Sequence, residues 1–124
     1  MNFKLTTAQK YWWPVTVRLP DPDRPGKIIK QRFKMQFEAQ PRDQVIADQE
    51  RLNALTGLSE IAEHEYDMLR RACTDWKDVD GEDGKPAPFT REAFDAQLQR
   101  TQFRVAVYEA YNESQSGEEA RLGN

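Results

Sequence analysis

The fold is decided by the segment Ile29-Lys30-Gln31-Arg32-Phe33-Lys34-Met35-Gln36-Phe37-Glu38. Its apolar residues Ile29, Phe33, Met35 and Phe37 fall on one face of an extended chain. The opposite face carries charged and amide side chains, namely Lys30, Arg32, Lys34, Gln36 and Glu38. This period of two predicts a β-strand with one buried and one solvated face.

A second alternating segment precedes the first, and the two are expected to pair. Val15, Val17 and Leu19 alternate with polar residues, whereas residues 1–13 are expected to form a polar lead outside the strand. Between the two strands, residues 20–26 contain three prolines and end in a glycine, which favours a long turn. The sequence therefore predicts an antiparallel hairpin. A lone hairpin is marginally stable in water, so its apolar face needs a cover.

The cover is expected to be helical. One helix is predicted to begin at Pro41-Arg42-Asp43 and to stop at Gly57. The next is predicted to reach Trp76, because apolar residues recur at spacings of three and four at Leu58, Ile61, Ala62, Leu69, Ala72, Cys73 and Trp76. After an acidic loop, Thr90 is a suitable N-cap between Phe89 and Phe94, which occupy hydrophobic-staple positions.

Helical periodicity then continues to about Asn112, and the pattern allows a break near Arg100-Thr101. The sequence thus predicts an α+β fold in which an N-terminal antiparallel β-hairpin packs against a C-terminal bundle of three to four α-helices. We expect a single domain over residues 1–124, with residues 1–10 and 114–124 flexible.

Composition narrows the class of protein. The 124 residues suffice for one modest core, and with 38% hydrophobic and 31% charged residues the chain is expected to be soluble. No apolar run approaches the roughly 18 residues of a membrane span, and the N-terminus lacks a signal-peptide core, so no membrane partner is expected. A single cysteine, Cys73, excludes an internal disulfide and fits a reducing cytoplasm.

Charge is unevenly distributed along the chain. Residues 1–41 hold eight Lys/Arg and three Asp/Glu, whereas residues 42–124 hold ten Lys/Arg and eighteen Asp/Glu. The two halves could therefore attract across subunits and drive self-association, which salt would weaken. The alternative interpretation is that both halves present ordinary solvated faces.

The acidic loop after Trp76 shares some features with a calcium-binding loop. If Asp78 is position 1 of an EF-hand loop, Asp80 and Glu82 supply positions 3 and 5. However, Asp83 stands at position 6, where glycine is needed, and Phe89 stands at position 12, where a carboxylate is needed. The pattern therefore favours a solvated connector over a metal site.

Other catalytic motifs are incomplete. The zinc-protease helix motif, which could start at His64-Glu65, needs a second histidine at position 68, where this chain has Met68. Cys73 lies among apolar residues and is expected in the core, and the sequence has no glycine-rich phosphate loop. The sequence therefore predicts a protein that is not an enzyme and that needs no cofactor or metal.

Aromatic residues near the basic strand suggest a binding surface. Lys30, Arg32 and Lys34 beside the tryptophans could suit nucleic acid, but the isoelectric point near 5.2 argues against that partner. The aromatics are better interpreted as core or interface anchors. We therefore assign partner binding to Trp12, Trp13, Phe33 and Phe37.

The order of these features resembles a known family. The matching segments are Phe3-Lys4-Leu5, Trp13-Pro14-Val15-Thr16-Val17, Phe33-Lys34-Met35-Gln36-Phe37, Trp76-Lys77-Asp78-Val79, Pro88-Phe89-Thr90, Ala110-Tyr111 and Ala120-Arg121-Leu122-Gly123-Asn124. Together they resemble the tail assembly chaperones of bacteriophages with long, non-contractile tails, over nearly the whole chain. The most specific block is the loop marked by Trp76, Asp78, Gly84, Phe89 and Thr90. Leu122 departs from the pattern, where a basic residue is expected.

The resemblance implies a non-enzymatic role in the host cell cytoplasm. Such chaperones bind the tape measure protein, keep it soluble and promote tail tube polymerisation, and they are absent from the mature virion. The family also implies a longer form, made by a −1 frameshift, that recruits the tail tube protein. The present chain would be the short form, and Leu122-Gly123-Asn124 can be encoded by a slippery heptamer. The alternative is a structural tail-completion or head–tail joining protein of a phage or prophage.

Overall fold

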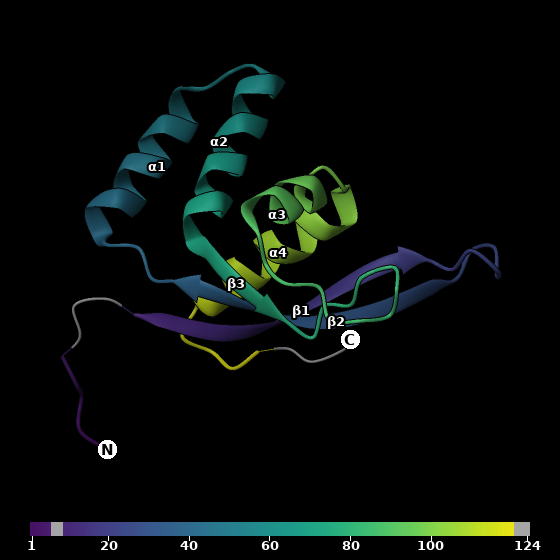
Figure 1. The fold of residues 1–124 in the computed structure, drawn as a ribbon. Helices are drawn as coiled ribbons and strands as arrows, with labels where there is room; N and C mark the ends of the chain where they lie inside the picture. Colours follow the sequence, from purple (N-terminus) through teal and green to yellow (C-terminus); the bar gives the residue numbers. More distant parts are fainter. Residues whose placement is uncertain (6–8, 121–124) are drawn as a thin grey trace.

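The computed structural model describes residues 1–5 and 9–120. In chain order these residues form β1 (Lys10–Pro20), β2 (Ile28–Glu38), α1 (Arg42–Ala54), α2 (Leu58–Ala72), β3 (Cys73–Lys77), α3 (Arg91–Leu98) and α4 (Thr101–Ser114). The strands make one antiparallel sheet in the order β1-β2-β3. The helices gather on one face of that sheet, so the predicted α+β class is confirmed (Figure 1).

The predicted hairpin is present, and its faces are those that the alternation indicated. β1 pairs with β2 from Lys10 opposite Glu38 to Pro20 opposite Ile28. The core-facing side chains of both strands are buried at Val15, Val17, Phe33, Met35 and Phe37. On the opposite face Lys30, Arg32 and Lys34 are exposed. The hairpin therefore presents one apolar face to the helices and one charged face to solvent.

The first strand is longer than predicted. It begins at Lys10, so Tyr11, Trp12 and Trp13 belong to it and not to a polar lead. Pro14 lies inside the strand, opposite Lys34. Proline is tolerated there because β1 is at the edge of the sheet, where a missing N–H breaks no ladder on the outer side.

The second helix is shorter than predicted, and its expected extension to Trp76 is wrong. α2 ends at Ala72, and residues Cys73–Lys77 form β3, which adds a third strand to the hairpin. Cys73 pairs with Phe37 and Asp75 with Gln36, which leaves Thr74 as an extra residue in a β-bulge. The bulge turns both Cys73 and Trp76 toward the core, although residues three apart in a regular strand face opposite sides. The bulged strand thus buries apolar residues three positions apart on one face, as a helix does.

The helices after the acidic loop follow the prediction. The Thr90 hydroxyl accepts a hydrogen bond from the Ala93 N–H at 3.0 Å, and the rings of Phe89 and Phe94 lie 5.6 Å apart between centroids. The break near Arg100 is real, because α3 ends at Leu98 and α4 begins at Thr101. α4 packs on β1 through its buried residues Ala106, Val107, Ala110 and Tyr111.

Thr90→Ala is expected to lower the free energy of unfolding by about 1 kcal/mol, because it removes the side-chain cap of α3. Urea unfolding followed by circular dichroism measures the change. Thr101→Ala is the matched control, since the exposed Thr101 is the first residue of α4 and not its N-cap. Equal losses in the two variants would contradict a capping role for Thr90.

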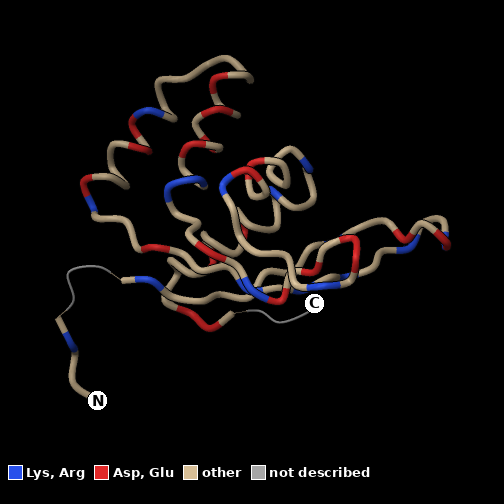
Figure 2. The backbone as a smooth tube through the Cα atoms, in the orientation of Figure 1, with Lys and Arg blue, Asp and Glu red and all other residues tan. Residues whose placement is uncertain are grey.

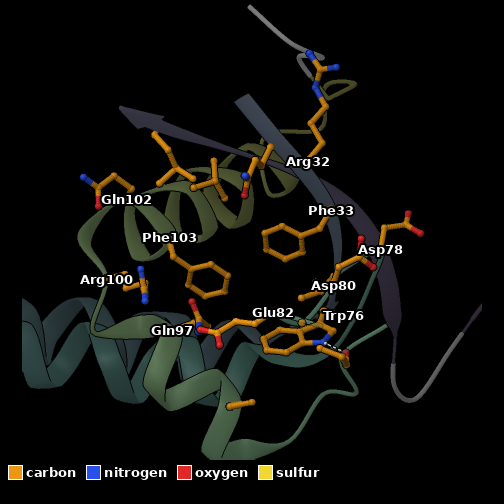
Figure 3. Close-up of a pocket in the computed structure, with 17 residues that line it drawn as sticks. Arg32, Phe33, Trp76, Asp78, Asp80, Glu82, Gln97, Arg100, Gln102 and Phe103 are labelled. Carbon is orange, nitrogen blue, oxygen red and sulfur yellow. Dashed lines mark hydrogen bonds between the residues drawn. The ribbon is translucent and has the colours of Figure 1, made fainter. Parts of the chain in front are cut away.

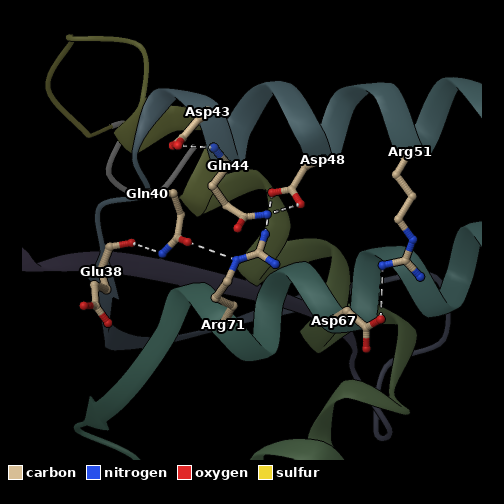
Figure 4. A network of polar contacts seen from close by, with 8 residues as sticks. All are labelled: Glu38, Gln40, Asp43, Gln44, Asp48, Arg51, Asp67 and Arg71. Carbon is tan, nitrogen blue, oxygen red and sulfur yellow. Dashed lines mark hydrogen bonds and ion pairs between the residues drawn. The ribbon is translucent and has the colours of Figure 1, made fainter.

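α1 is attached to the rest of the fold mainly by polar contacts, and none of its residues is buried. The Arg71 guanidinium of α2 donates to Gln40 at 3.0 Å and pairs with Asp48 of α1 (Figure 4). Arg51 pairs with Asp67 one turn further along, at 3.3 Å. The predicted apolar stripe of α2 therefore reaches the core only at its C-terminal end, and Leu58 at its start is exposed.

The start of β1 is joined to the end of α4 by side-chain hydrogen bonds, whereas residues 1–5 lie outside the regular structure. Lys10 lies in β1 and Ser114 lies in α4, and the Tyr11 hydroxyl joins these elements by a 2.7 Å hydrogen bond to Ser114. The Trp13 indole adds a 2.9 Å bond to Glu113. Residues 1–5 have no regular structure and are exposed. The proposed frameshift site at Leu122-Gly123-Asn124 lies outside the described residues.

Candidate interaction groove

An open groove lies between the turn-proximal half of the hairpin, the loop after β3 and the junction of α3 and α4 (Figure 3). Its volume is about 740 Å³, which is within the usual range of protein ligand sites. We call it the open groove. Its lining consists of Val17, Leu19, Gln31, Arg32, Phe33, Trp76, Asp78, Val79, Asp80, Gly81, Glu82, Ala87, Ala93, Gln97, Arg100, Gln102 and Phe103.

The floor of the open groove is aromatic and aliphatic. The rings of Phe33 and Phe103 are stacked, with centroids 5.6 Å apart and planes within 5° of parallel. The Trp76 indole meets Phe103 edge-on at 6.5 Å, and Val17 and Leu19 continue the floor along β1. The hairpin extends past α4, which begins only at Thr101, so Leu19 and Phe103 stay partly exposed.

The two walls differ in charge. The loop after β3 contributes the carboxylates Asp78, Asp80 and Glu82 on one side. Arg100 and Gln102 lie on the far side of the Phe33 and Phe103 rings from Asp78 and Asp80, whereas Gln97 lies beside Glu82 (Figure 3). An occupant with an apolar strip and basic groups along one flank would therefore match the floor and the acidic wall together.

The acidic wall is a small, hydrogen-bonded hairpin. β3 ends at Lys77, and the next residue, Asp78, has a positive φ of 64°. The Ala87 N–H then donates a hydrogen bond to the Val79 carbonyl at 2.8 Å. Gly84 turns the chain at a φ of 78°, a conformation that glycine adopts without strain. The Trp76 indole N–H donates to the Ala87 carbonyl at 2.8 Å and ties the loop to the sheet.

Asp78 is fixed by an ion pair to the open face of the sheet. The Lys34 ammonium donates to its carboxylate at 2.6 Å. This hydrogen bond, together with the positive charge of Lys34, lowers the pKa of Asp78 from its usual range. Because the pKa is lower in the folded than in the unfolded chain, the pair stabilises the fold above about pH 4. That contribution is lost as the pH falls through the folded-state pKa.

Asp78→Asn is accordingly expected to destabilise the chain at neutral pH but not at a pH well below 4, where the carboxylate is protonated in both states. Asparagine also tolerates the positive φ at this position, so the backbone is preserved. Unfolding midpoints measured from pH 2 to 7 test this. In a double-mutant cycle, Lys34→Met should remove the same pH-dependent stability, because it removes the partner of Asp78. If Asp78→Asn still differed in stability from the unsubstituted chain at pH 2, the ion pair would not be the cause.

The four residues assigned to partner binding do not form one surface. Phe37 is fully buried between Tyr11 and Tyr111, and Phe33 is buried beside Phe103. Trp13 is half-buried on the same face. Trp12 lies on the opposite face, 37% exposed, with the Lys77 ammonium 4.1 Å from its ring centroid. Only Phe33 lines the open groove, and Trp12 is the only exposed member of the four.

The loop residues that carried the resemblance have distinct positions. Trp76 and Asp78 line the open groove, whereas Gly84, Phe89 and Thr90 shape the loop and the start of α3 behind it. Phe89 packs edge-on against Trp76 with centroids 5.1 Å apart. Within the described residues, no group of three or more His, Cys, Asp and Glu side chains is placed to hold a metal ion.

Sequence reasoning missed several residues that line the groove. Val17, Leu19, Gln97, Arg100 and Phe103 come from segments far apart in the chain. One local signal was the difference in length between the hairpin and the helix that covers it. Each strand of the hairpin has 11 residues, and the sequence placed the start of the covering helix near Arg100-Thr101. That mismatch implies an uncovered end of the apolar face.

Charge on the surface follows the division seen in the sequence. Figure 2 shows acidic residues distributed along α1, α2 and the loop after β3, and basic residues along the hairpin.

The single cysteine, Cys73, is buried, and its burial raises the pKa of the thiol. No helix in the described part of the chain combines the length and apolarity needed to cross a bilayer. Comparison with known proteins gave no match to a family model, a curated protein or a solved structure.

Proposed function

We propose that this protein is a phage tail assembly chaperone that holds amphipathic helical segments of a tape measure protein in its open groove. The observation that carries the proposal is an apolar floor, partly exposed at Leu19 and Phe103, between an acidic wall and a wall of amide and basic groups. The resemblance of the loop from Trp76 to Thr90 supplies the biological setting. Together they favour a protein that binds an extended helical client.

The chemistry of the groove suits such a client. An amphipathic helix presents apolar residues at i, i+3, i+4 and i+7, which can pack on Leu19, Phe33 and Phe103. Charged residues beside that stripe meet Asp80 and Glu82 on one side and Arg100 on the other. One groove buries only a few client side chains, so affinity per copy is modest, and many copies along one client gain avidity.

The lining favours binding over covalent chemistry. Its polar groups are carboxylates, guanidiniums and amides; no serine, threonine, cysteine, lysine or histidine appears among the described residues of the lining. Asp78 is already paired with Lys34. These groups can steer and orient a charged helix, since electrostatic complementarity raises association rates and selects partners.

Co-expression with a helical segment of the tape measure protein from the same phage tests the proposal. The chain is expected to keep that segment soluble and to co-purify with it. Leu19→Asp should abolish capture, because it places a charge in the apolar floor. Asp80→Lys combined with Glu82→Lys should weaken it, and both positions are exposed, so folding is preserved.

Leu58→Asp is the matched control for Leu19→Asp, because Leu58 is 86% exposed at the start of α2 and far from the groove residues in the chain. Capture that survives in the folded groove variants, or that is lost equally in the control, would refute the groove as the client site. Purified phage particles distinguish the alternative role: a chaperone should be absent from them, and a tail-completion or head–tail joining protein should be retained.

A further inference from the structure

The first five residues are exposed, and three of them, Met1, Phe3 and Leu5, have large apolar side chains. Phe3 is 90% exposed and Leu5 is 87% exposed, and Asn2 and Lys4 alternate with them. Alternation with period two is typical of a strand that buries one side against a partner. We interpret these two large apolar side chains, exposed two residues apart, as an interaction segment.

The open groove has the complementary chemistry. Its floor of Leu19, Phe33 and Phe103 can receive the side chains of Phe3 and Leu5. Its acidic wall, with Asp80 and Glu82, can receive the Lys4 ammonium that projects from the opposite side of an extended segment. The segment and the open groove thus both carry apolar side chains, and their charged groups are of opposite sign.

The segment cannot fill the far end of its own groove. Five residue steps separate Leu5 from Lys10, which is at most about 18 Å of chain. Leu19 lies nine steps along β1 from Lys10, or about 30 Å. Figure 1 also shows residues 1–5 near the end of the sheet opposite the hairpin turn. For Phe3 and Leu5 to pack on Leu19, the segment therefore has to come from another molecule.

We propose that residues 1–5 of one copy bind in the open groove of a second copy, with Phe3 and Leu5 on the aromatic floor and Lys4 beside the acidic wall. Each copy then offers a segment at one end and a groove at the other, so the contact is head-to-tail and can extend through further copies. In relation to the proposed function, the segment occupies the client site until a client displaces it.

Sedimentation velocity over a range of concentrations tests the association. The unsubstituted chain should form species larger than the 14.5 kDa monomer, and Phe3→Ser combined with Leu5→Ser should sediment as a monomer at the same concentrations. Leu58→Ser, which removes an equally exposed leucine elsewhere, should not change the distribution. Identical distributions for the unsubstituted and the doubly substituted chain would overturn the proposal.

A charge swap tests the predicted orientation. Lys4→Glu should weaken association by about two- to five-fold at low salt, as should Asp80→Lys with Glu82→Lys. The chain that carries all three substitutions should recover the original association, because the pairing is restored with reversed signs. Failure of the combined variant to recover would overturn the pairing of Lys4 with the acidic wall.

Disulfide trapping locates the contact. A Phe3→Cys chain mixed with a Gln102→Cys chain under mild oxidation should give a covalent heterodimer, since Gln102 is exposed and lines the groove. The native Cys73 is buried and does not compete. A Glu60→Cys chain, exposed on α2, is the control. Equal cross-linking at Glu60 would refute the proposal. The proposal would also fail if a chain with both Phe3→Cys and Gln102→Cys formed the disulfide within itself and the two separate chains did not cross-link.

The chaperone function is tested separately from this contact. If the segment shields the groove, the Phe3→Ser/Leu5→Ser chain should capture the tape measure segment at lower concentration than the unsubstituted chain, because more grooves are free. If neither the unsubstituted nor the Phe3→Ser/Leu5→Ser chain captures any client, while the Phe3→Cys and Gln102→Cys chains still cross-link, the proposed function is removed and the contact between copies remains. Unchanged capture would show that the segment does not occupy the client site.

Discussion

Phe37→Ala is expected to lower the free energy of unfolding by about 3–5 kcal/mol. Phe37 is fully buried at the centre of β2, and its ring contacts Tyr11 from the first strand and Tyr111 from the last helix. Its removal leaves a cavity where the two ends of the described fold meet. Neither β1 nor α4 can move into it freely, because the Tyr11 and Trp13 side chains are also hydrogen-bonded to the end of α4.

Equilibrium unfolding in urea measures this loss, since a single domain of this size is expected to unfold in two states. At a concentration where the chain is monomeric, Phe3→Ala is the control with the same chemical change, because Phe3 is almost fully exposed in the monomer. The control should change the free energy of unfolding by less than about 0.5 kcal/mol. A small loss for Phe37→Ala would mean that its ring is not in the core and would return it to the partner-binding set.

Trp76→Ala is expected to cost about 3–5 kcal/mol and also to release the acidic loop from the sheet. The indole is buried, lies edge-on against both Phe89 and Phe103, and donates its N–H to Ala87. One side chain thus joins β3 to the loop, to α3 through Phe89, and to the floor of the open groove. Client capture should therefore fall together with stability.

Trp76→Phe separates these contributions, because it keeps most of the apolar area and removes the N–H donor. We expect a loss of about 1–3 kcal/mol for this change, from the unsatisfied carbonyl of Ala87 and the smaller ring. Trp12→Phe is the control, since Trp12 is partly exposed on the open face of the sheet. If Trp76→Phe were as harmless as Trp12→Phe, the hydrogen bond to Ala87 would not hold the loop.

The sequence predicted those elements whose signals are local. Alternation defined β2, and a threonine between two phenylalanines placed the start of α3. The third strand was missed because its evidence is not local: Cys73–Lys77 becomes a strand by pairing with residues almost forty positions earlier. The bulge at Thr74 then hid the period of two, so that a strand carried the apolar spacing of a helix.

The groove was harder to predict than the fold, for a related reason. Each of its residues has an ordinary explanation in its own segment, such as Leu19 as a strand residue or Arg100 as a helix terminus. Their shared role depends on where α4 starts relative to the end of the hairpin. The aromatic residues drew attention as interface candidates, but burial assigns Phe37 to the core and leaves Trp12 exposed on the far face.

The polar attachment of α1 has a consequence for how the molecule opens. Because α1 buries no side chain and is held to α2 mainly by the Arg71 and Arg51 contacts, it can separate without disturbing the sheet or α4. The chain therefore has two parts that unfold differently. The sheet and helices α2 to α4 unfold together, whereas α1 has its own local unfolding equilibrium. Amide hydrogens of α1 should then exchange with solvent by a route independent of global unfolding, at a rate that rises with ionic strength.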